Sequence, residues 1–91
     1  MIRSFRHKRL KAFFETGAAG KIAASLRARI LVRLDALDAA STLAELNQPG
    51  FDFHGLKGVP KRYTIHVNGP WCITFGWQDG NAVAVDLEQY H

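Results

Sequence analysis

The sequence predicts a small α+β domain, in which an antiparallel-dominated sheet carries two N-terminal helices packed on one face. In the first half of the chain, apolar residues recur at three- and four-residue intervals, as in helices with one buried side. Beyond residue 60, apolar and polar residues alternate over three runs, as in strands with one buried face. The 91 residues suffice for one core, so we expect a single domain over residues 1–91.

The first half is expected to be mainly helical. A short strand over residues 2–5 should precede a helix over residues 8–16, which Gly17 would end. Residues 21–40 carry the clearest helical pattern. Its apolar stripe consists of Ile22, Leu26, Ile30, Leu34 and Leu37, and the arginines expected mostly off this stripe are Arg27, Arg29 and Arg33.

A short connection should join the helices to the sheet. Ser41 is the expected N-cap of a helical turn over residues 42–46. The sequence NQPG at residues 47–50 would end that turn, and a short strand should follow over residues 53–57.

Three longer strands are predicted over residues 63–67, 71–77 and 83–87, joined by hairpin turns at residues 68–70 and 79–81. Matching the apolar faces across each hairpin sets the register. The expected apolar pairs are Val67–Trp71, Ile65–Ile73, Tyr63–Phe75, Val83–Trp77, Val85–Phe75 and Leu87–Ile73. The expected polar pairs are His66–Cys72, Thr64–Thr74, Arg62–Gly76, Asp86–Thr74 and Glu88–Cys72.

The helices should cover the apolar face of this sheet and leave the polar face open. Thr74, Gly76 and Ala84 would lie at the centre of the open face. Because these side chains are small, we expect a shallow trough in which a ligand could lie.

Charge is distributed unevenly along the chain. Residues 1–33 carry nine lysines and arginines against one glutamate, a net charge of +8, whereas residues 34–91 carry three against seven acidic residues, a net charge of −4. A polycationic surface attracts phosphate backbones without reading their sequence, although such a helical face can equally serve solubility alone.

Several classes of protein are disfavoured. No apolar run approaches the ~20 residues that a membrane span needs, and the basic start is not followed by the apolar stretch of a signal peptide. The single cysteine, Cys72, excludes an internal disulfide. We therefore expect a cytoplasmic protein without membrane contact.

Five blocks of the sequence, spread from the first residue to the last, resemble the HigB group of RelE-type bacterial toxins. They are residues 1–8 (MIRSFRHK), 43–47 (LAELN), 54–58 (HGLKG), 71–75 (WCITF) and 90–91 (YH). The resemblance implies a small microbial-ribonuclease-like fold and a ribosome-dependent endoribonuclease that cleaves mRNA and so inhibits translation. It also implies a HigA-like helix-turn-helix antitoxin as partner, with operator DNA contacted only through that antitoxin.

RNA cleavage needs no cofactor, because the 2′-hydroxyl can attack the neighbouring phosphate. The protein must move two protons and stabilise charge on the phosphate, which suits imidazoles, carboxylates and fixed cations. No cofactor or metal is expected. The candidates for this chemistry are His54, Lys57, Arg62, His66, Glu88, Tyr90 and His91.

The resemblance assigns roles to four of these residues. It implies proton transfer by His54 and His91 and phosphate stabilisation by Lys57. Tyr90 would stack on a base or orient a proton carrier. Taken singly, each is an ordinary surface residue, and only their joint placement in the family pattern favours a catalytic role.

Cys72 is a departure from the family pattern, since many relatives have an arginine at this place in the strand. Arg62 or protonated His66 could supply the missing cation, and Lys61 is a further candidate for RNA binding. Alternatively, the chain belongs to a weaker branch, or Cys72 is an inactivating change. Gln89 also stands where some relatives have an aspartate. A nucleophilic Cys72 with His66 and Glu88 is disfavoured, because side chains on directly paired strands point in parallel.

The basic N-terminal region fits the same resemblance, because a ribosome-dependent toxin must grip ribosomal RNA. The candidate ribosome-binding residues are Arg3, Arg6, Lys8, Arg9, Lys11 and Arg27. Two rival interpretations stay open. One is a catalytically inactive homologue that binds antitoxin or ribosome and tunes operator repression, and the other is a free RNase that acts without the ribosome.

Overall fold

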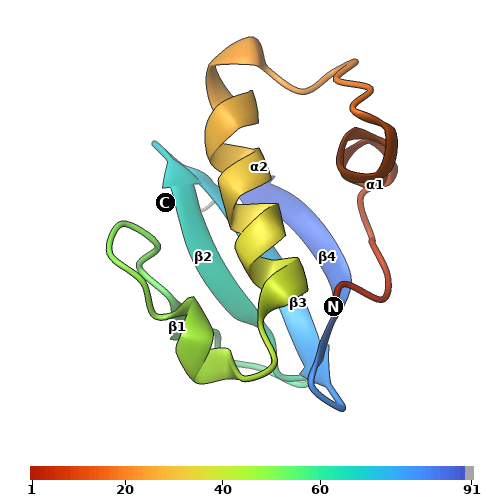
Figure 1. Ribbon diagram of the computed structural model, residues 1–91. Helices are drawn as coiled ribbons and strands as arrows, with labels where there is room; N and C mark the ends of the chain where they lie inside the picture. Colours follow the sequence, from red (N-terminus) through yellow and green to blue (C-terminus); the bar gives the residue numbers. More distant parts are fainter. Residues whose placement is uncertain (90–91) are drawn as a thin grey trace.

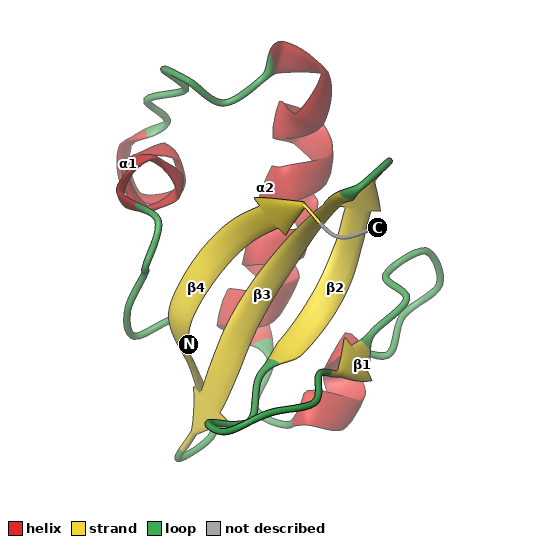
Figure 2. Cartoon of the chain, turned by 180° about the vertical axis from the view of Figure 1, so that it is seen from behind, coloured by secondary structure: helices red, strands yellow, loops and turns green. Residues whose placement is uncertain are grey.

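A computed structural model describes residues 1–89, in which helix α2 lies across one face of a four-stranded antiparallel sheet of order β1-β2-β3-β4 (Figure 1). Seen from the other side, the sheet has no helix over it, and α1 lies beside its β4 edge (Figure 2). The predicted α+β class is confirmed. The elements are α1 (Lys8–Thr16), α2 (Ala24–Ala39), the 3-10 helix η1 (Leu43–Leu46), β1 (His54–Gly55), β2 (Tyr63–Asn68), β3 (Trp71–Gln78) and β4 (Asn81–Gln89).

The core lies between α2 and the sheet. The predicted stripe of α2 is buried there, and α1 contributes Leu10 and Phe13 to the same cluster. Removing these side chains from water is the main favourable term in folding a domain of this size. Within residues 1–89, neither helix has the length and apolar character that crossing a membrane requires. The fully buried side chains that line the core from the two layers include Ile30, Leu34, Leu37, Ile65, Ile73, Phe75 and Val85.

The first helix has its predicted bounds, but the second starts later than expected. Gly17 ends α1 with a left-handed φ of 79°, and its N–H donates to Phe13 O at 3.0 Å. Helix α2 begins at Ala24 rather than at residue 21, because Lys21 has a φ of 69° that no helix can contain. Ile22 is buried all the same, as part of the approach to the helix.

Two local predictions in the first half are wrong. Residues 2–5 are not a strand but form two isolated parallel bridges, Ile2 with Ala82 and Phe5 with Val85. The ladder is interrupted because β4 is irregular between these two contacts. The N-cap of η1 is Thr42 rather than Ser41, and the Glu45 carboxylate accepts the N–H groups of both residues.

The predicted register is confirmed over most of the sheet and fails at the two hairpin ends. At the β2–β3 turn Asn68, not Val67, pairs with Trp71, and Arg62 precedes the first ladder pair of β2. In β4 a bulge places Ala84 and Val85 together opposite Phe75, so that Trp77 pairs with Ala82 and Gly76 with Val83. Pairs confirmed are Ile65–Ile73, Tyr63–Phe75, Thr64–Thr74, His66–Cys72, Leu87–Ile73, Asp86–Thr74 and Glu88–Cys72.

The bulge changes which side chains face the core. Ala84, within the bulge, has a left-handed φ of 49°. Ala82 is therefore buried, whereas Val83 lies half-buried opposite Gly76 instead of facing the helices as predicted. Over residues 81–83 the side chains therefore project to the opposite face from the one predicted.

Arg33 was expected off the buried side of α2, and this prediction is also wrong. Its side chain is only 7% exposed, and its guanidinium donates to His66 O at 2.6 Å, Arg29 O at 3.2 Å and Gly50 O at 3.3 Å. The guanidinium carbon also lies 4.8 Å from the centre of the Phe51 ring. Burial, and then the charge of Arg29, lower the pKa of Arg33. Arg33 thus joins α2 to β2 and to the loop before β1.

Candidate active site

Polar side chains gather on the open face of the sheet in two cross-strand rows. The first row runs His54, Thr64, Thr74 and Asp86 across all four strands. The second row runs His66, Cys72 and Glu88 across β2, β3 and β4. Because directly paired residues project to the same side, both rows lie on the face that no helix covers (Figure 2).

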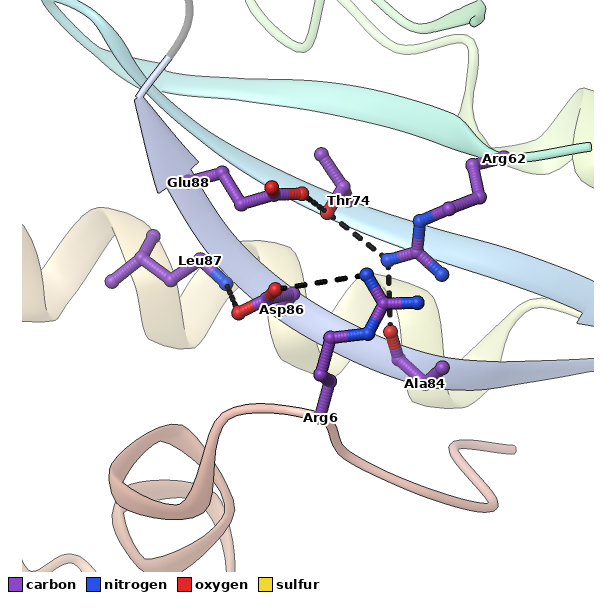
Figure 3. Close-up of polar contacts among 7 residues, drawn as sticks. All are labelled: Arg6, Arg62, Thr74, Ala84, Asp86, Leu87 and Glu88. Carbon is purple, nitrogen blue, oxygen red and sulfur yellow. Dashed lines mark hydrogen bonds and ion pairs between the residues drawn. The ribbon is translucent and has the colours of Figure 1, made fainter. Parts of the chain in front are cut away.

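Arg62 is fixed at the centre of this face, just before β2 begins. Its Nη2 donates to Thr74 Oγ1 at 3.1 Å and to Ala84 O at 2.9 Å (Figure 3). The Thr74 side chain is fully buried, and its hydroxyl donates in turn to the Glu88 carboxylate. A single hydroxyl therefore links the guanidinium of Arg62 to the carboxylate of Glu88, the next-to-last described residue.

A second guanidinium, that of Arg6, reaches the same face from the N-terminal segment beside β4. Its Nη1 lies 4.0 Å from Asp86 Oδ2, and Asp86 Oδ1 accepts the N–H of Leu87 at 2.9 Å (Figure 3). The Arg6 side chain is 53% exposed, so the ion pair itself adds little stability. It does place a second positive charge next to Arg62.

His54 is exposed on the edge strand β1, and one hydrogen bond sets the tautomer of its neutral ring. Nδ1 lies 2.8 Å from Asp52 O. A carbonyl oxygen only accepts, so the neutral ring carries its proton on Nδ1 and leaves Nε2 as the acceptor. An imidazole in this state can take a proton from a hydroxyl.

His54 and Lys57 do not touch the Arg62 network. His54 on β1 and Thr74 on β3 are separated by β2, which at ordinary strand spacing places them about 10 Å apart. Lys57 is exposed in the loop that follows β1. Tyr90 and His91, the other two predicted catalytic residues, lie outside the described residues.

The remaining candidates for phosphate binding have partners of their own. Lys61 Nζ donates to Leu56 O at 2.9 Å and lies 5.7 Å from the centre of the Tyr63 ring. His66 Nε2 lies 2.9 Å from Gly69 O, so the ring donates across the β2–β3 turn. These contacts favour a structural role for His66 and leave Lys61 as a surface cation.

The alternative of a nucleophilic Cys72 gains no support. Cys72 is half-buried and pairs in register with His66 and Glu88, as predicted. The ring of His66 is bonded to Gly69 and the carboxylate of Glu88 to Thr74. The base and the carboxylate that a thiol nucleophile would need are therefore engaged elsewhere.

The predicted ribosome-binding side chains are all exposed. Arg27 is tied back to the chain before its own helix, with Nε donating to Ile22 O at 3.0 Å and Nη2 to Ala19 O at 3.3 Å. The others lie along the N-terminal segment and α1, and they are Arg3, Arg6, Lys8, Arg9 and Lys11.

The sequence did not reveal the contacts among Arg62, Thr74 and Glu88. Thr74 looked like one small residue on an open face, and nothing in its pattern indicated a buried hydroxyl bonded on two sides. The predicted pairing of Asp86 with Thr74 placed β4 correctly, but only side-chain geometry shows that Glu88, from the next row, reaches Thr74.

Comparison with known proteins agrees with this fold. A family model described as the RelE-like toxin of the type II toxin–antitoxin system HigB matches residues 3–91. The chain belongs to this family. It is also similar to Endoribonuclease HigB of Proteus vulgaris, with 41% identity over 92 residues that span the whole of both chains. Membership of a type II toxin family implies an antitoxin partner.

Proposed function

We propose that this HigB-family toxin is an endoribonuclease that cuts mRNA on the ribosome and thereby inhibits translation. The observation that carries the proposal is the 41% identity, over the full length, to a protein named Endoribonuclease HigB. The open face supports it, because a fixed guanidinium and an imidazole with a free acceptor nitrogen lie on one uncovered surface.

The reaction would use the substrate's own 2′-hydroxyl as nucleophile. One imidazole, of His54 or His91, takes the proton from that hydroxyl as its oxygen bonds to phosphorus. The other gives a proton to the 5′-oxygen as the P–O bond breaks, and Tyr90 positions the substrate. Lys57 and Arg62 stabilise the charge that builds on the phosphate oxygens.

Arg62 would supply the guanidinium that many relatives carry where this chain has Cys72. Its hydrogen bonds to Thr74 and Ala84 help to hold it on the open face, and fixed donors stabilise developing charge without having to reorganise. A charge-assisted hydrogen bond to phosphate contributes about 1.5–3 kcal/mol.

The partners would be the ribosome with its mRNA and a HigA-like helix-turn-helix antitoxin, through which alone operator DNA is contacted. Such a protein would act in the cytoplasm, where ribosomes translate. The exposed cations of the first 27 residues would anchor it to ribosomal RNA. Co-sedimentation of charge-reversed Arg3, Lys8 and Arg9 variants with ribosomes across a salt series tests this, and unchanged binding would contradict it.

The central test is mapping of new mRNA 5′ ends after induction of the toxin. Wild type should produce new ends within translated regions, and Lys57→Ala and His91→Ala should lose them and relieve growth arrest. Arg29→Ala removes one exposed positive charge from α2 and should behave as wild type. Efficient cleavage of naked RNA at low protein concentration would instead favour a free RNase.

The position of Cys72 supports a second candidate, a weakened or inactive toxin that acts only by binding. Cys72 lies between His66 and Glu88 on the open face, where it adds no charge. If wild type produces no new ends and Cys72→Arg does, the natural chain is the binding module. If both produce ends at similar rates, Arg62 is sufficient and the nuclease is confirmed.

A further inference from the structure

The open face has a hollow near the β3–β4 turn and away from the Cys72 row. Its volume is about 430 Å³, within the ~300–1,000 Å³ usual for small-ligand sites. Among the residues that line it are Arg6, Arg62, Gly76, Gln78, Val83 and Ala84.

The bulge in β4 shapes the floor of this hollow. The extra residue turns Val83 onto the open face opposite Gly76. Two contacts hold Ala84 in its left-handed conformation: its N–H donates to Ser4 Oγ at 2.8 Å, and its carbonyl accepts from Arg62. The floor is therefore apolar and supported from two sides.

Gly76 keeps the floor open. A Cβ at this position would lie 3.1 Å from a methyl carbon of Val83 and 3.9 Å from Lys61 O. Any larger side chain would have to project into the hollow. The absence of a side chain here and the outward turn of Val83 together leave room for a flat, partly apolar group.

The rim of the hollow is positively charged. Arg6 and Arg62 reach it from opposite sides of β4 and interact with Asp86 and Ala84, two residues apart on that strand (Figure 3). Asp86 lies 4.0 Å from Arg6 and Glu88 accepts from the Thr74 hydroxyl, and no acidic residue is among the described residues that line the hollow. Two guanidinium groups that line one hollow attract an anion such as a phosphate.

We propose that this hollow is a subsite for one nucleotide of single-stranded RNA. The base or ribose covers the floor formed by Gly76, Val83 and Ala84, and the attached phosphate lies between Arg6 and Arg62. Single-stranded nucleic-acid sites combine these two elements, an apolar platform and cations that follow the backbone.

The subsite rests on the proposed function and extends it along the open face. Arg62 lines the hollow and also contacts Thr74, the member of the first row that lies between His54 and Asp86. An RNA strand could therefore cross the face with one nucleotide in the hollow and its neighbour toward His54. The hollow would then hold the nucleotide next to the cut, whose phosphate Arg62 contacts, and its floor would affect where the chain cuts.

The test is an NMR titration of the isolated full-length protein with adenosine 5′-monophosphate, ribose 5-phosphate and inorganic phosphate. The nucleotide should shift the backbone amides of Gly76, Val83 and Ala84 in a saturable way. Affinity should fall from the nucleotide to ribose 5-phosphate to phosphate, because only the nucleotide uses both floor and rim. Unmoved amides in the hollow, or equal affinities for all three probes, would overturn the proposal.

Matched variants separate charge from shape. Val83→Glu should weaken nucleotide binding about tenfold or more, and Val83→Gln, of the same size, should weaken it less, because only the former repels phosphate. Arg6→Ala should weaken it several-fold, and Arg29→Ala, the same charge change on α2, should leave it unchanged. Equal losses in the Glu and Gln variants, or an Arg29→Ala loss as large as that of Arg6→Ala, would overturn the charge-based site.

Cleavage mapping distinguishes failure of this proposal from failure of the proposed function. Val83→Gln should redistribute cut positions, whereas Lys57→Ala should abolish all cuts. If wild type binds the nucleotide in the hollow but produces no new 5′ ends, the nuclease proposal fails and the subsite stands. If wild type cuts mRNA and the amides of the hollow do not respond, the subsite fails alone.

Discussion

Arg33 on the covered face of the sheet and Arg62 on the open face are both fixed by hydrogen bonds, but their surroundings suit different roles. Arg33 comes from α2 on the covered face and donates to three backbone carbonyls at 7% exposure. Arg62 lies on the open face and donates to a hydroxyl and a carbonyl beside an open hollow. Both guanidinium groups are fixed, but only that of Arg62 is placed where a substrate phosphate can approach.

This contrast teaches that a fixed cation is not by itself a functional signal. The charge of Arg33 is balanced by carbonyl dipoles and by the face of Phe51 inside the fold. The surroundings of Arg62 are a polar row and an apolar floor, which suit an RNA strand. Substitutions at the two positions should therefore affect different measurements.

The largest expected effect is on stability, in Arg33→Ala. Truncation removes the donors for His66 O and Gly50 O and opens space beneath α2, so we expect a loss of about 3 kcal/mol in the free energy of unfolding. Urea unfolding with a constant m-value measures this. Arg29→Ala, exposed on the same helix, should change it by less than about 0.5 kcal/mol. If both variants unfold alike, Arg33 is not a structural residue.

A smaller loss, seen in activity rather than in unfolding, is expected for Arg62→Ala. Removing the guanidinium should lower the rate of mRNA cleavage by about tenfold or more, and unfolding should change by no more than about 1 kcal/mol. Arg62→Lys keeps the charge but not the planar, forked geometry of the guanidinium and should recover only part of the activity. If Arg62→Ala lost as much stability as Arg33→Ala, Arg62 would be a structural residue like Arg33.

Thr74→Val tests whether the position of Arg62 matters. The substitution keeps the shape of a fully buried side chain and removes the hydroxyl that bonds Arg62 and Glu88. We expect a several-fold fall in cleavage rate with a stability change of about 1 kcal/mol. Thr74→Ser retains the hydroxyl and should restore the rate. A Ser variant as slow as the Val variant would show that packing, not positioning, is involved.

The sequence predicted the fold because the pattern of apolar residues governs it. The stripe of α2 and the three alternating runs, Val83 excepted, face the core as expected, and matching apolar faces placed Ile65, Ile73 and Leu87 in their observed register. Periodicity fails where the backbone leaves regular geometry. Neither the bulge at Ala84 nor the left-handed φ of Lys21 interrupts the pattern of apolar residues, so that pattern does not reveal them.

The candidate site was less predictable because side-chain bonding decides it. The open face and the placement of Arg62 on it followed from register, but Arg33 looked like one more surface arginine of a basic helix. Its burial depends on a carbonyl of β2 and another from the loop at Gly50, contacts that join segments distant in the chain. No local pattern of residues encodes such contacts.

The smallest expected effect concerns a support for the covered face, the capping carboxylate of Glu45. It accepts the N–H groups of Thr42 and Ser41, and these bonds lower its pKa. A lowered pKa in the folded state adds stability above the ordinary carboxyl pKa of about 4.3, and that stability is lost as pH falls through the folded value. Glu45→Gln should therefore unfold at slightly lower urea than wild type at pH 7, and the two midpoints should lie closer together at pH 3. A gap of the same size at both pH values would mean that the charge of Glu45 does not support this turn.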